Sequence, residues 1–302
     1  MCGIAGFLDK TQNDQTRVGQ IILKMLTALG VRGPDSAGVA LYSYRHNGNM
    51  ALRIKLGESG AFGEKGPQIA ERIQTLGRVQ EVSTTAEYLR LVMDYQGDAQ
   101  PLEHLIESVD NDIEVVSMGY QLEIVKQVGS PQNLDATHGI STFMGTHGLG
   151  HTRLSTESRV DLSHSQPFWA HGYPDLAIVH NGHITNYHKL RRRYEQHNVK
   201  FYTENDSEII GVYLAERLSQ GLTLKEALDA SLIDLDGSFS YLVATPDAIG
   251  FAKDPFAFKP LLFTETDNFV AVATEEIAIR AAFENAYEVR EAQAQDVKIW
   301  QR

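Results

Sequence analysis

The chain has 302 residues, enough for one large domain or two modest ones, and its 42% hydrophobic and 22% charged residues are ordinary for a soluble globular protein. Its 27 Lys and Arg stand against 39 Asp and Glu, a net charge of −12. This acidic balance argues against nucleic acid or an anionic membrane surface as the main partner. No run of about 18 apolar residues is present. The N-terminus lacks the basic segment of a secretory signal, so we expect a cytoplasmic protein without a membrane span.

The first elements are predicted to be buried strands around one helix. Short apolar runs at 3–8 and 37–43 are bounded by Gly, Asp and Pro, as is typical of buried strands, and 49–55 is predicted to be another strand. Apolar residues from Val18 to Leu29 recur at helical spacing, and Gly30 is a plausible C-terminal stop.

From about residue 57 to 136 the chain becomes more polar. Helical periodicity is visible at 69–76, again at 88–92, and a third time at 102–106. No catalytic signature stands out in this stretch. We interpret it as a partly helical insertion within one domain that spans residues 1–302.

Strand-like sequence returns after residue 143. The predicted strands lie at 175–181, 240–245, 248–252, 260–264 and 269–274. One helix is predicted from Asp206 to about Gly221, and another at roughly 223–233. Because strands and helices come in groups and do not alternate, the pattern favours stacked sheets covered by helices over a doubly wound parallel sheet.

The chain has one cysteine, Cys2, which excludes an intramolecular disulfide and a Cys-rich metal site. A lone cysteine is usually a small buried hydrophobe. At position 2, however, removal of Met1 would leave it as the chain terminus. A free thiol has a pKa of about 8.5 and needs a base, whereas a terminal α-amino group has a pKa of about 7.7 to 8.0. A processed Cys2 would therefore carry both nucleophile and base for acyl transfer.

Five short segments, in order and at similar spacing, resemble the class II glutamine amidotransferase family. They are MCGIAGF at the N-terminus, RGPDSAG (32–38), GHTRLST (150–156), VHNGHITN (179–186) and NDSE (205–208). Five motifs in order are far more specific than any one of them. One departure is Leu154, where members that make glucosamine phosphate have Trp. This difference does not affect the expected glutaminase chemistry, but it leaves the subfamily of the chain open.

The resemblance implies roles for the catalytic residues. Cys2 is expected to be the nucleophile and, through its amine, the base. The side-chain amide of Asn181 and the backbone N–H of Gly182 are expected to form the oxyanion hole, where aimed donors stabilise developing negative charge. An Asn–Gly pair also suits a hairpin turn, which is the alternative for this dipeptide. Arg32 and Asp35 are expected to hold their loop against Cys2, a structural role.

The resemblance also implies a glutamine site. Arg153 is expected to clamp the α-carboxylate, since a guanidinium can hold it with two parallel hydrogen bonds, although a surface ion pair is the alternative. Ser155 and Thr156 follow in the same block and are assigned to substrate binding. Asp206 is expected to bind the substrate ammonium; the alternative is that it only caps the helix that begins there, and both roles could hold at once.

Five histidines gather in this part of the sequence and raise the question of a metal site. They are His151, His164, His171, His180 and His183. No pair has the i, i+4 spacing of a helical metal motif, and the surrounding pattern predicts strands. We expect no metal.

The fold implied by the resemblance is α+β, a four-layer α/β/β/α Ntn-hydrolase sandwich with two antiparallel sheets. Relatives usually carry a synthase domain that uses the ammonia. Here no Gly-rich phosphate loop is visible, and one lone cysteine cannot hold a four-thiolate iron–sulfur cluster. We expect a hetero-oligomer in which this chain has no cofactor of its own. Its partners would be glutamate synthase-like subunits with FMN and an iron–sulfur cluster, such as those of N-methylglutamate synthase. The alternatives are another Ntn amidohydrolase, or a non-catalytic structural or regulatory subunit.

Overall fold

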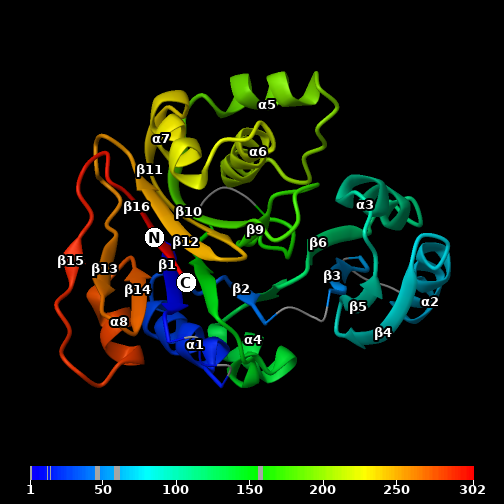
Figure 1. Cartoon of the computed structure of the whole chain (residues 1–302), viewed down its shortest axis with the longest axis horizontal. Helices are drawn as coiled ribbons and strands as arrows, with labels where there is room; N and C mark the ends of the chain where they lie inside the picture. Colours follow the sequence, from blue (N-terminus) through cyan, green and yellow to red (C-terminus); the bar gives the residue numbers. More distant parts are fainter. Residues whose placement is uncertain (1, 12, 14, 45–47, 58–61, 156–158) are drawn as a thin grey trace.

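The computed structural model describes residues 2–11, 13, 15–44, 48–57, 62–155 and 159–302. Two antiparallel sheets face each other in its main body (Figure 1). The first has seven strands, in the order β15 (Arg290–Glu291), β13 (Leu262–Glu265), β14 (Phe269–Ala273), β1 (Gly3–Asp9), β8 (His147–Arg153), β2 (Ser36–Tyr42) and β7 (Leu122–Val128). The second has five, in the order β16 (Val297–Gln301), β12 (Ala248–Lys253), β11 (Gly237–Thr245), β10 (Ala177–Ile184) and β9 (Phe168–Trp169).

Helices cover the outer faces of both sheets. The seven-stranded sheet is covered by α1 (Val18–Leu29), α4 (Pro131–His138) and α8 (Glu276–Ala282), with the short 3₁₀ turn η1 (Ile140–Thr142) against α1. The five-stranded sheet is covered by α6 (Asp206–Ser219) and α7 (Leu224–Asp234), with α5 (Tyr187–Glu195) packed on α6. The predicted order of layers, helix, sheet, sheet, helix, is therefore present.

The covering of both faces explains the continuous apolar runs of the sequence. Every residue of β1 is buried, and its side chains alternate between the two sides of the sheet. Ile4 and Leu8 belong to the core shared by the two sheets, while Ala5 and Phe7 pack with α1 and α8. The predicted strands at both ends of the chain and the helices α1, α6 and α7 are confirmed to within a few residues.

The predicted insertion contributes most of a third antiparallel sheet, whereas a partly helical segment was expected there. Its strand order is β4 (Arg78–Thr85), β5 (Tyr88–Asp94), β3 (Met50–Lys55) and β6 (Glu114–Gly119), with α2 (Phe62–Ile73) and α3 (Ala99–Glu107) beside it. Figure 1 shows this unit to one side of the main body. It includes β3, which lies before residue 57, whereas β7 and α4 belong to the main body although they lie within 57–136.

One helix prediction in this region was wrong. The segment at 88–92 is the strand β5, between β3 and β4. Leu89, Leu91 and Met93 alternate along it and join the buried core. A short apolar run fits both a helix and a strand, so periodicity alone could not decide, and pairing with two neighbouring strands did. None of the helices in the described part of the chain is long and apolar enough to cross a lipid bilayer.

Candidate active site

Cys2 lies immediately before β1, at the end where the neighbouring strand β8 finishes. Its thiol is partly buried, and Sγ accepts a hydrogen bond from the backbone N–H of Leu154 at 3.4 Å. A pocket of about 720 Å³ opens beside it, and Arg153, Asn181 and Asp206 also line this pocket. The fold thus brings four of the predicted site residues, distant in sequence, around one cavity.

Asn181 and Gly182 lie inside strand β10 of the facing sheet, paired with Ser240 and Phe239 of β11. The hairpin-turn alternative for this dipeptide is therefore wrong. Asn181 Nδ2 donates to the backbone carbonyl of Cys2 at 3.1 Å, which joins the two sheets at the pocket. Gly182 has φ +141°, and a Cβ there would stand 2.2 Å from the carbonyl oxygen of Ser238, so only glycine fits.

Arg153 is the last residue of β8 and is buried. Burial lowers the pKa of Arg153, while the neighbouring Cys2, Asp161 and Asp35 act in the opposite direction. Its Nη1 donates to the carbonyl of Arg159 at 2.9 Å. The alternative of a surface position for Arg153 is thus wrong; a buried guanidinium at the pocket wall can receive a carboxylate.

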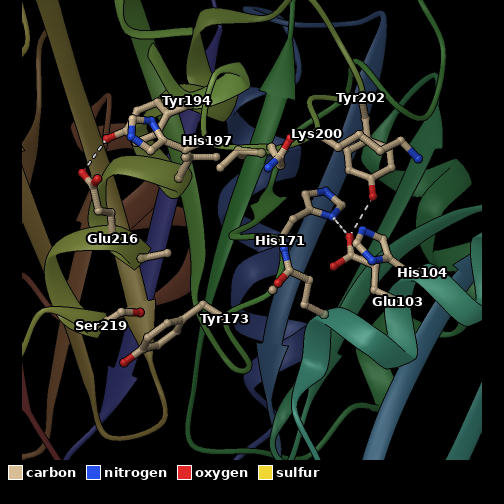
Figure 2. A pocket seen from close by; sticks show the side chains of 16 residues that line it. Glu103, His104, His171, Tyr173, Tyr194, His197, Lys200, Tyr202, Glu216 and Ser219 are labelled. Atoms are coloured by element: carbon tan, nitrogen blue, oxygen red, sulfur yellow. Dashed lines mark hydrogen bonds and ion pairs between the residues drawn. The ribbon is translucent and has the colours of Figure 1, made fainter. Parts of the chain in front are cut away.

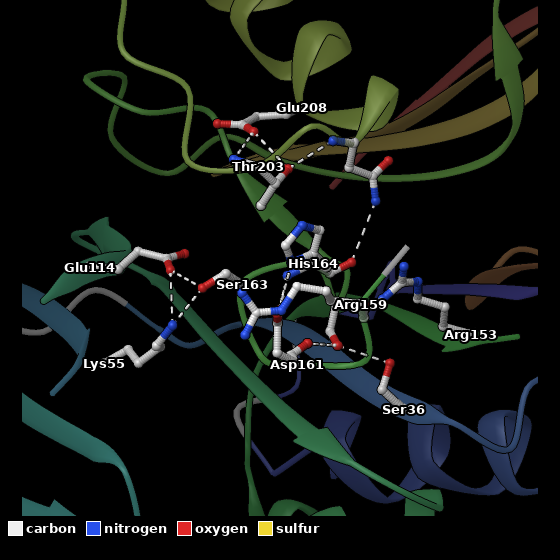
Figure 3. A network of polar contacts seen from close by, with 12 residues as sticks. Ser36, Lys55, Glu114, Arg153, Arg159, Asp161, Ser163, His164, Thr203 and Glu208 are labelled. Atoms are coloured by element: carbon white, nitrogen blue, oxygen red, sulfur yellow. Dashed lines mark hydrogen bonds and ion pairs between the residues drawn. The ribbon is translucent and has the colours of Figure 1, made fainter. Parts of the chain in front are cut away.

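The loop that contacts Arg153 is anchored by a polar network (Figure 3). Asp161 Oδ1 accepts the backbone N–H of His164 at 2.8 Å. Further along the loop, Ser163 receives a hydrogen bond from Lys55 of β3 at 2.6 Å. Since β3 belongs to the third sheet, the insertion is connected to the wall of the pocket.

The segment 32–35 packs against the end of β8. A Cβ at Gly33 would lie 2.5 Å from the backbone carbon of Thr152, so this close approach requires glycine. Asp35 Oδ2 accepts the backbone N–H of Ser155 at 2.7 Å. Arg32 forms an ion pair with Glu275, and its Nε lies 3.4 Å from the Cys2 carbonyl oxygen. Thr156 lies outside the described residues.

Asp206 is the first residue of α6, and it is not the cap of that helix. Asn205 occupies the cap position, and its side chain accepts from the backbone N–H of Ser207 at 3.0 Å. Asp206 Oδ2 accepts the backbone N–H of Ile184 at 2.7 Å, which ties α6 to the end of β10. His183 Nδ1 lies 3.5 Å from the same oxygen. The carboxylate therefore adds fixed negative charge to the pocket wall, where it can face an ammonium group.

Several pocket residues were not assigned a role from the sequence. Gln166 and Ser207 hold His180: Gln166 Oε1 accepts the His180 backbone N–H at 2.6 Å, and the His180 ring contacts Ser207 Oγ at 2.8 Å. Burial lowers the pKa of His180. Thr274 Oγ1 accepts the N–H of Ile4 at 2.7 Å. His180 and Ser207 lie within the quoted motif blocks, which was the available signal.

Of the five clustered histidines, His180 and His183 line the pocket, and His151 lies behind it in contact with Asn181. His164 contacts Asp161, and His171 contacts Glu103. His183 is largely exposed. Among the residues that the structure describes, no three His, Cys, Asp or Glu side chains are grouped as a metal site.

A second pocket, of about 290 Å³, lies between α3 and the segment that includes α6 (Figure 2). His171 Nδ1 contacts Glu103 Oε1 at 2.6 Å, and Tyr202 donates to the same oxygen at 2.8 Å. Lys200 pairs with Glu107 at 2.7 Å. These contacts join the insertion to the main body, because both glutamates belong to α3.

Several known proteins with similar sequences are named as glutamine amidotransferases. A family model described as "Glutamine amidotransferase domain" matches residues 151–281. A protein of Methanothermobacter thermautotrophicus named "Putative glutamine amidotransferase" is 35% identical over 307 residues, with all of both chains covered. The "Glutamine amidotransferase-like protein GlxB" of Rhizobium meliloti is 33% identical over 280 residues, which cover 92% of this chain and 91% of that protein.

Solved structures share the fold at low identity. The glutamine phosphoribosylpyrophosphate amidotransferase of B. subtilis matches with a TM-score of 0.62 and 20% identity, over 99% of this chain. A structure described as the allosteric regulatory enzyme of purine biosynthesis matches with a TM-score of 0.64 and 19% identity, also over 99% of this chain. The chain spans about half the length of both, 49% and 47% respectively. The four-layer sandwich is thus the Ntn-hydrolase fold of such domains, and the chain belongs to the class II glutamine amidotransferase family.

Proposed function

We propose that this chain hydrolyses the side-chain amide of glutamine through a thioester on Cys2. In the first step, Cys2 Sγ attacks the amide carbon while the thiol proton passes to the α-amino group of the processed terminus. The C–N bond then breaks, the amine returns the proton to the leaving nitrogen, and ammonia departs. Water finally cleaves the thioester to give glutamate and the free thiol.

The observation that carries the proposal is the meeting of Cys2 and Asn181 at one pocket, with Asn181 Nδ2 3.1 Å from the Cys2 carbonyl oxygen. In the proposed reaction, Asn181 Nδ2 and the N–H of Gly182 stabilise the oxyanion. Two aimed donors suit this task because they require no reorganisation when charge develops.

The same pocket suits a free amino acid. Arg153 would bind the α-carboxylate of glutamine, with Ser155 and Thr156 beside it, and Asp206 would bind the ammonium. A buried cation and a carboxylate on one wall favour a zwitterion, because each charge of the ligand then has a partner.

Arg32 and Asp35 would support the loops on either side of Cys2, Arg32 beside its carbonyl and Asp35 through the N–H of Ser155.

We further propose that the ammonia is delivered to a partner synthase in a hetero-oligomer in the cytoplasm. A glutamate synthase-like or N-methylglutamate synthase complex is our preferred assignment, with FMN and an iron–sulfur cluster in the partner subunits. The support is the organisation of the chain. An insertion lies between the second and third glutaminase motifs, and no phosphate-binding loop is visible in the sequence. Co-purification of the native complex and identification of its chains would test the assignment. Recovery of a partner without flavin or iron–sulfur cluster would contradict it.

The catalytic proposal is tested by Cys2→Ala in the full chain, with Cys2→Ser as a matched variant that keeps a weaker nucleophile. Cys2→Ala is expected to abolish glutamate release from glutamine, while ammonia-dependent turnover of the assembled complex survives. Persistence of glutamine-dependent turnover would refute the assignment of Cys2.

The two alternatives give different outcomes. Preferential hydrolysis of an acyl amide that lacks the α-carboxylate and ammonium would identify another Ntn amidohydrolase. A retained Met1 in the intact mass, together with no hydrolysis, would favour a non-catalytic subunit.

A further inference from the structure

The side chain of Asn181 has only one orientation that satisfies its neighbours. The oxygen and nitrogen of an amide have nearly the same shape, so hydrogen bonds decide which way the group points. On one side lies the carbonyl oxygen of Cys2, at 3.1 Å, which can only accept. The amide nitrogen must therefore face Cys2, and the amide oxygen must face the opposite side.

The neighbour on that opposite side is His151. This residue lies on β8, is 1% exposed, and its Nε2 is 3.3 Å from Asn181 Oδ1. Burial lowers the pKa of His151 to about 3, so the ring is neutral near pH 7 and carries a single proton. Since Oδ1 can only accept, that proton must be on Nε2. His151 Nδ1 makes no hydrogen bond with another described residue, in agreement with this tautomer, and the backbone of His180 near the ring has a smaller effect on its pKa than Asn181.

We propose that His151 is a positioning residue: it donates its Nε2 proton to Asn181 Oδ1 and so holds Asn181 Nδ2 toward Cys2 and the pocket. This inference rests on the proposed function, because it assigns Asn181 as an oxyanion donor. It adds a role for a histidine of the GHTRLST block that does not touch the substrate.

The physical need for such a residue follows from the amide torsion. The terminal torsion of Asn is broad and nearly two-fold, so an unrestrained amide can rotate. In a rotated Asn181, the amide oxygen would face the developing negative charge. This oxygen would repel the oxyanion, whereas the N–H group of the correct orientation attracts it. Removal of one oxyanion-hole donor costs about 10² to 10³ in kcat in subtilisin, where the donor is also an Asn side chain. Removal of the His151 ring, which orients the donor Asn181 Nδ2, is expected to lower kcat less, by about 10- to 100-fold.

His147 offers a matched control. It lies four residues earlier on β8, so its side chain is on the same face of the strand. It is also buried, burial lowers its pKa to about 3, and its Nε2 bonds the Thr245 carbonyl at 2.8 Å. Its ring nitrogens contact Thr146 and Thr245, whereas Nε2 of His151 contacts Asn181. His147 Nδ1 also contacts Thr146 Oγ1 at 2.7 Å, so His147→Phe removes at least as much buried hydrogen bonding as His151→Phe.

The kinetic test measures glutamate release by the full chain. His151→Phe is expected to lower kcat about 10- to 100-fold with KM changed less than about threefold, because the ground-state contacts to glutamine are made by other residues. His147→Phe is expected to lose at least as much thermal stability as His151→Phe, with kcat within about threefold of wild type. His151→Gln, whose amide nitrogen can replace Nε2, is expected to recover most of the rate. Equal kcat losses in the two Phe variants would show a merely structural role.

A double-mutant cycle tests whether His151 acts through Asn181. In an Asn181→Ala background, His151→Phe is expected to have no further effect on kcat, since there is no amide left to orient. Full additivity of the two losses would overturn the proposal.

A spectroscopic measurement decides the hydrogen bond without reference to activity. Imidazole ¹H–¹⁵N spectra of the ¹⁵N-histidine-labelled chain, with His151 assigned from His151→Phe, are expected to show the neutral Nε2–H tautomer at pH 7. The Nδ1–H tautomer or an imidazolium would refute the inference. If the wild type releases no glutamate, the proposed function fails, and this spectrum still decides how the Asn181 amide is held.

Discussion

The replacement of Gly182 by alanine tests how closely β10 and β11 approach at the pocket. An ideal Cβ at Gly182 would lie 2.2 Å from Ser238 O and 2.6 Å from Phe239 Cα. Real Cβ atoms essentially never come closer than 3.0 Å to such atoms. Both neighbours are backbone atoms of β11, which is itself paired with β12, so no flexible side chain can move aside.

The expected cost has two sources. A residue with a side chain at φ +141° is strained by about 1 to 3 kcal/mol. Overpacking against fixed neighbours adds about 1 to 3 kcal/mol. Gly182→Ala is thus expected to lower the free energy of unfolding by about 2 to 6 kcal/mol, a large part of the stability of a typical domain.

Urea unfolding of the full chain measures this loss, with Gly221→Ala as the control. Gly221 also has a positive φ, +89°, and no heavy atom would lie within 4 Å of its Cβ. The control is therefore expected to lose only about 1 to 2 kcal/mol from the backbone term. Equal losses in the two variants would show that the close approach of β10 and β11 is not a constraint, and the geometric reasoning would be wrong.

Two further predictions concern charged groups. Asp206→Asn is expected to raise KM for glutamine about 10- to 100-fold with a nearly unchanged melting temperature, because Asn can still accept the Ile184 N–H; an unchanged KM would exclude a contact with the ammonium. The buried contact between His171 and Glu103 is expected to make stability depend on pH. Burial lowers the pKa of His171, but Glu103 outweighs it and raises that pKa above 6.5, whereas His171 holds the pKa of Glu103 below 4.5 although burial opposes this. The unfolding free energy of the wild type should therefore exceed that of His171→Gln, and the difference should be largest between about pH 4.5 and 6.5. The difference should shrink as pH rises through the His171 pKa and as pH falls through the Glu103 pKa. A difference that stays constant from pH 4 to 9 would contradict this reasoning.

The sequence predicted the main body well because its signals there are local. The apolar spacing of α1, the strand-rich C-terminal half and the grouping of elements each depend on residues close in the chain. The family was identified from five motifs in order, and the relatives that align along nearly the whole chain confirm it. The roles of the individual site residues stay predictions.

Other features depended on contacts between distant segments. The 88–92 segment became a strand because β3 and β4 pair with it. Asn181 and Gly182 continue a strand where their local preference was a turn, since β11 pairs with both. Asn205 caps α6, and the carboxylate of Asp206 accepts a hydrogen bond from the backbone of β10.

The residue types for the chemistry were thus visible in the sequence, whereas their arrangement was decided by tertiary structure. Cys2 and Asn181 are 179 residues apart and meet only because two sheets stack face to face. The contact of His151 with Asn181 arises from the same stacking, across 30 residues of chain. A motif can specify which side chains are present, but the distance and direction between them are set by how the layers pack.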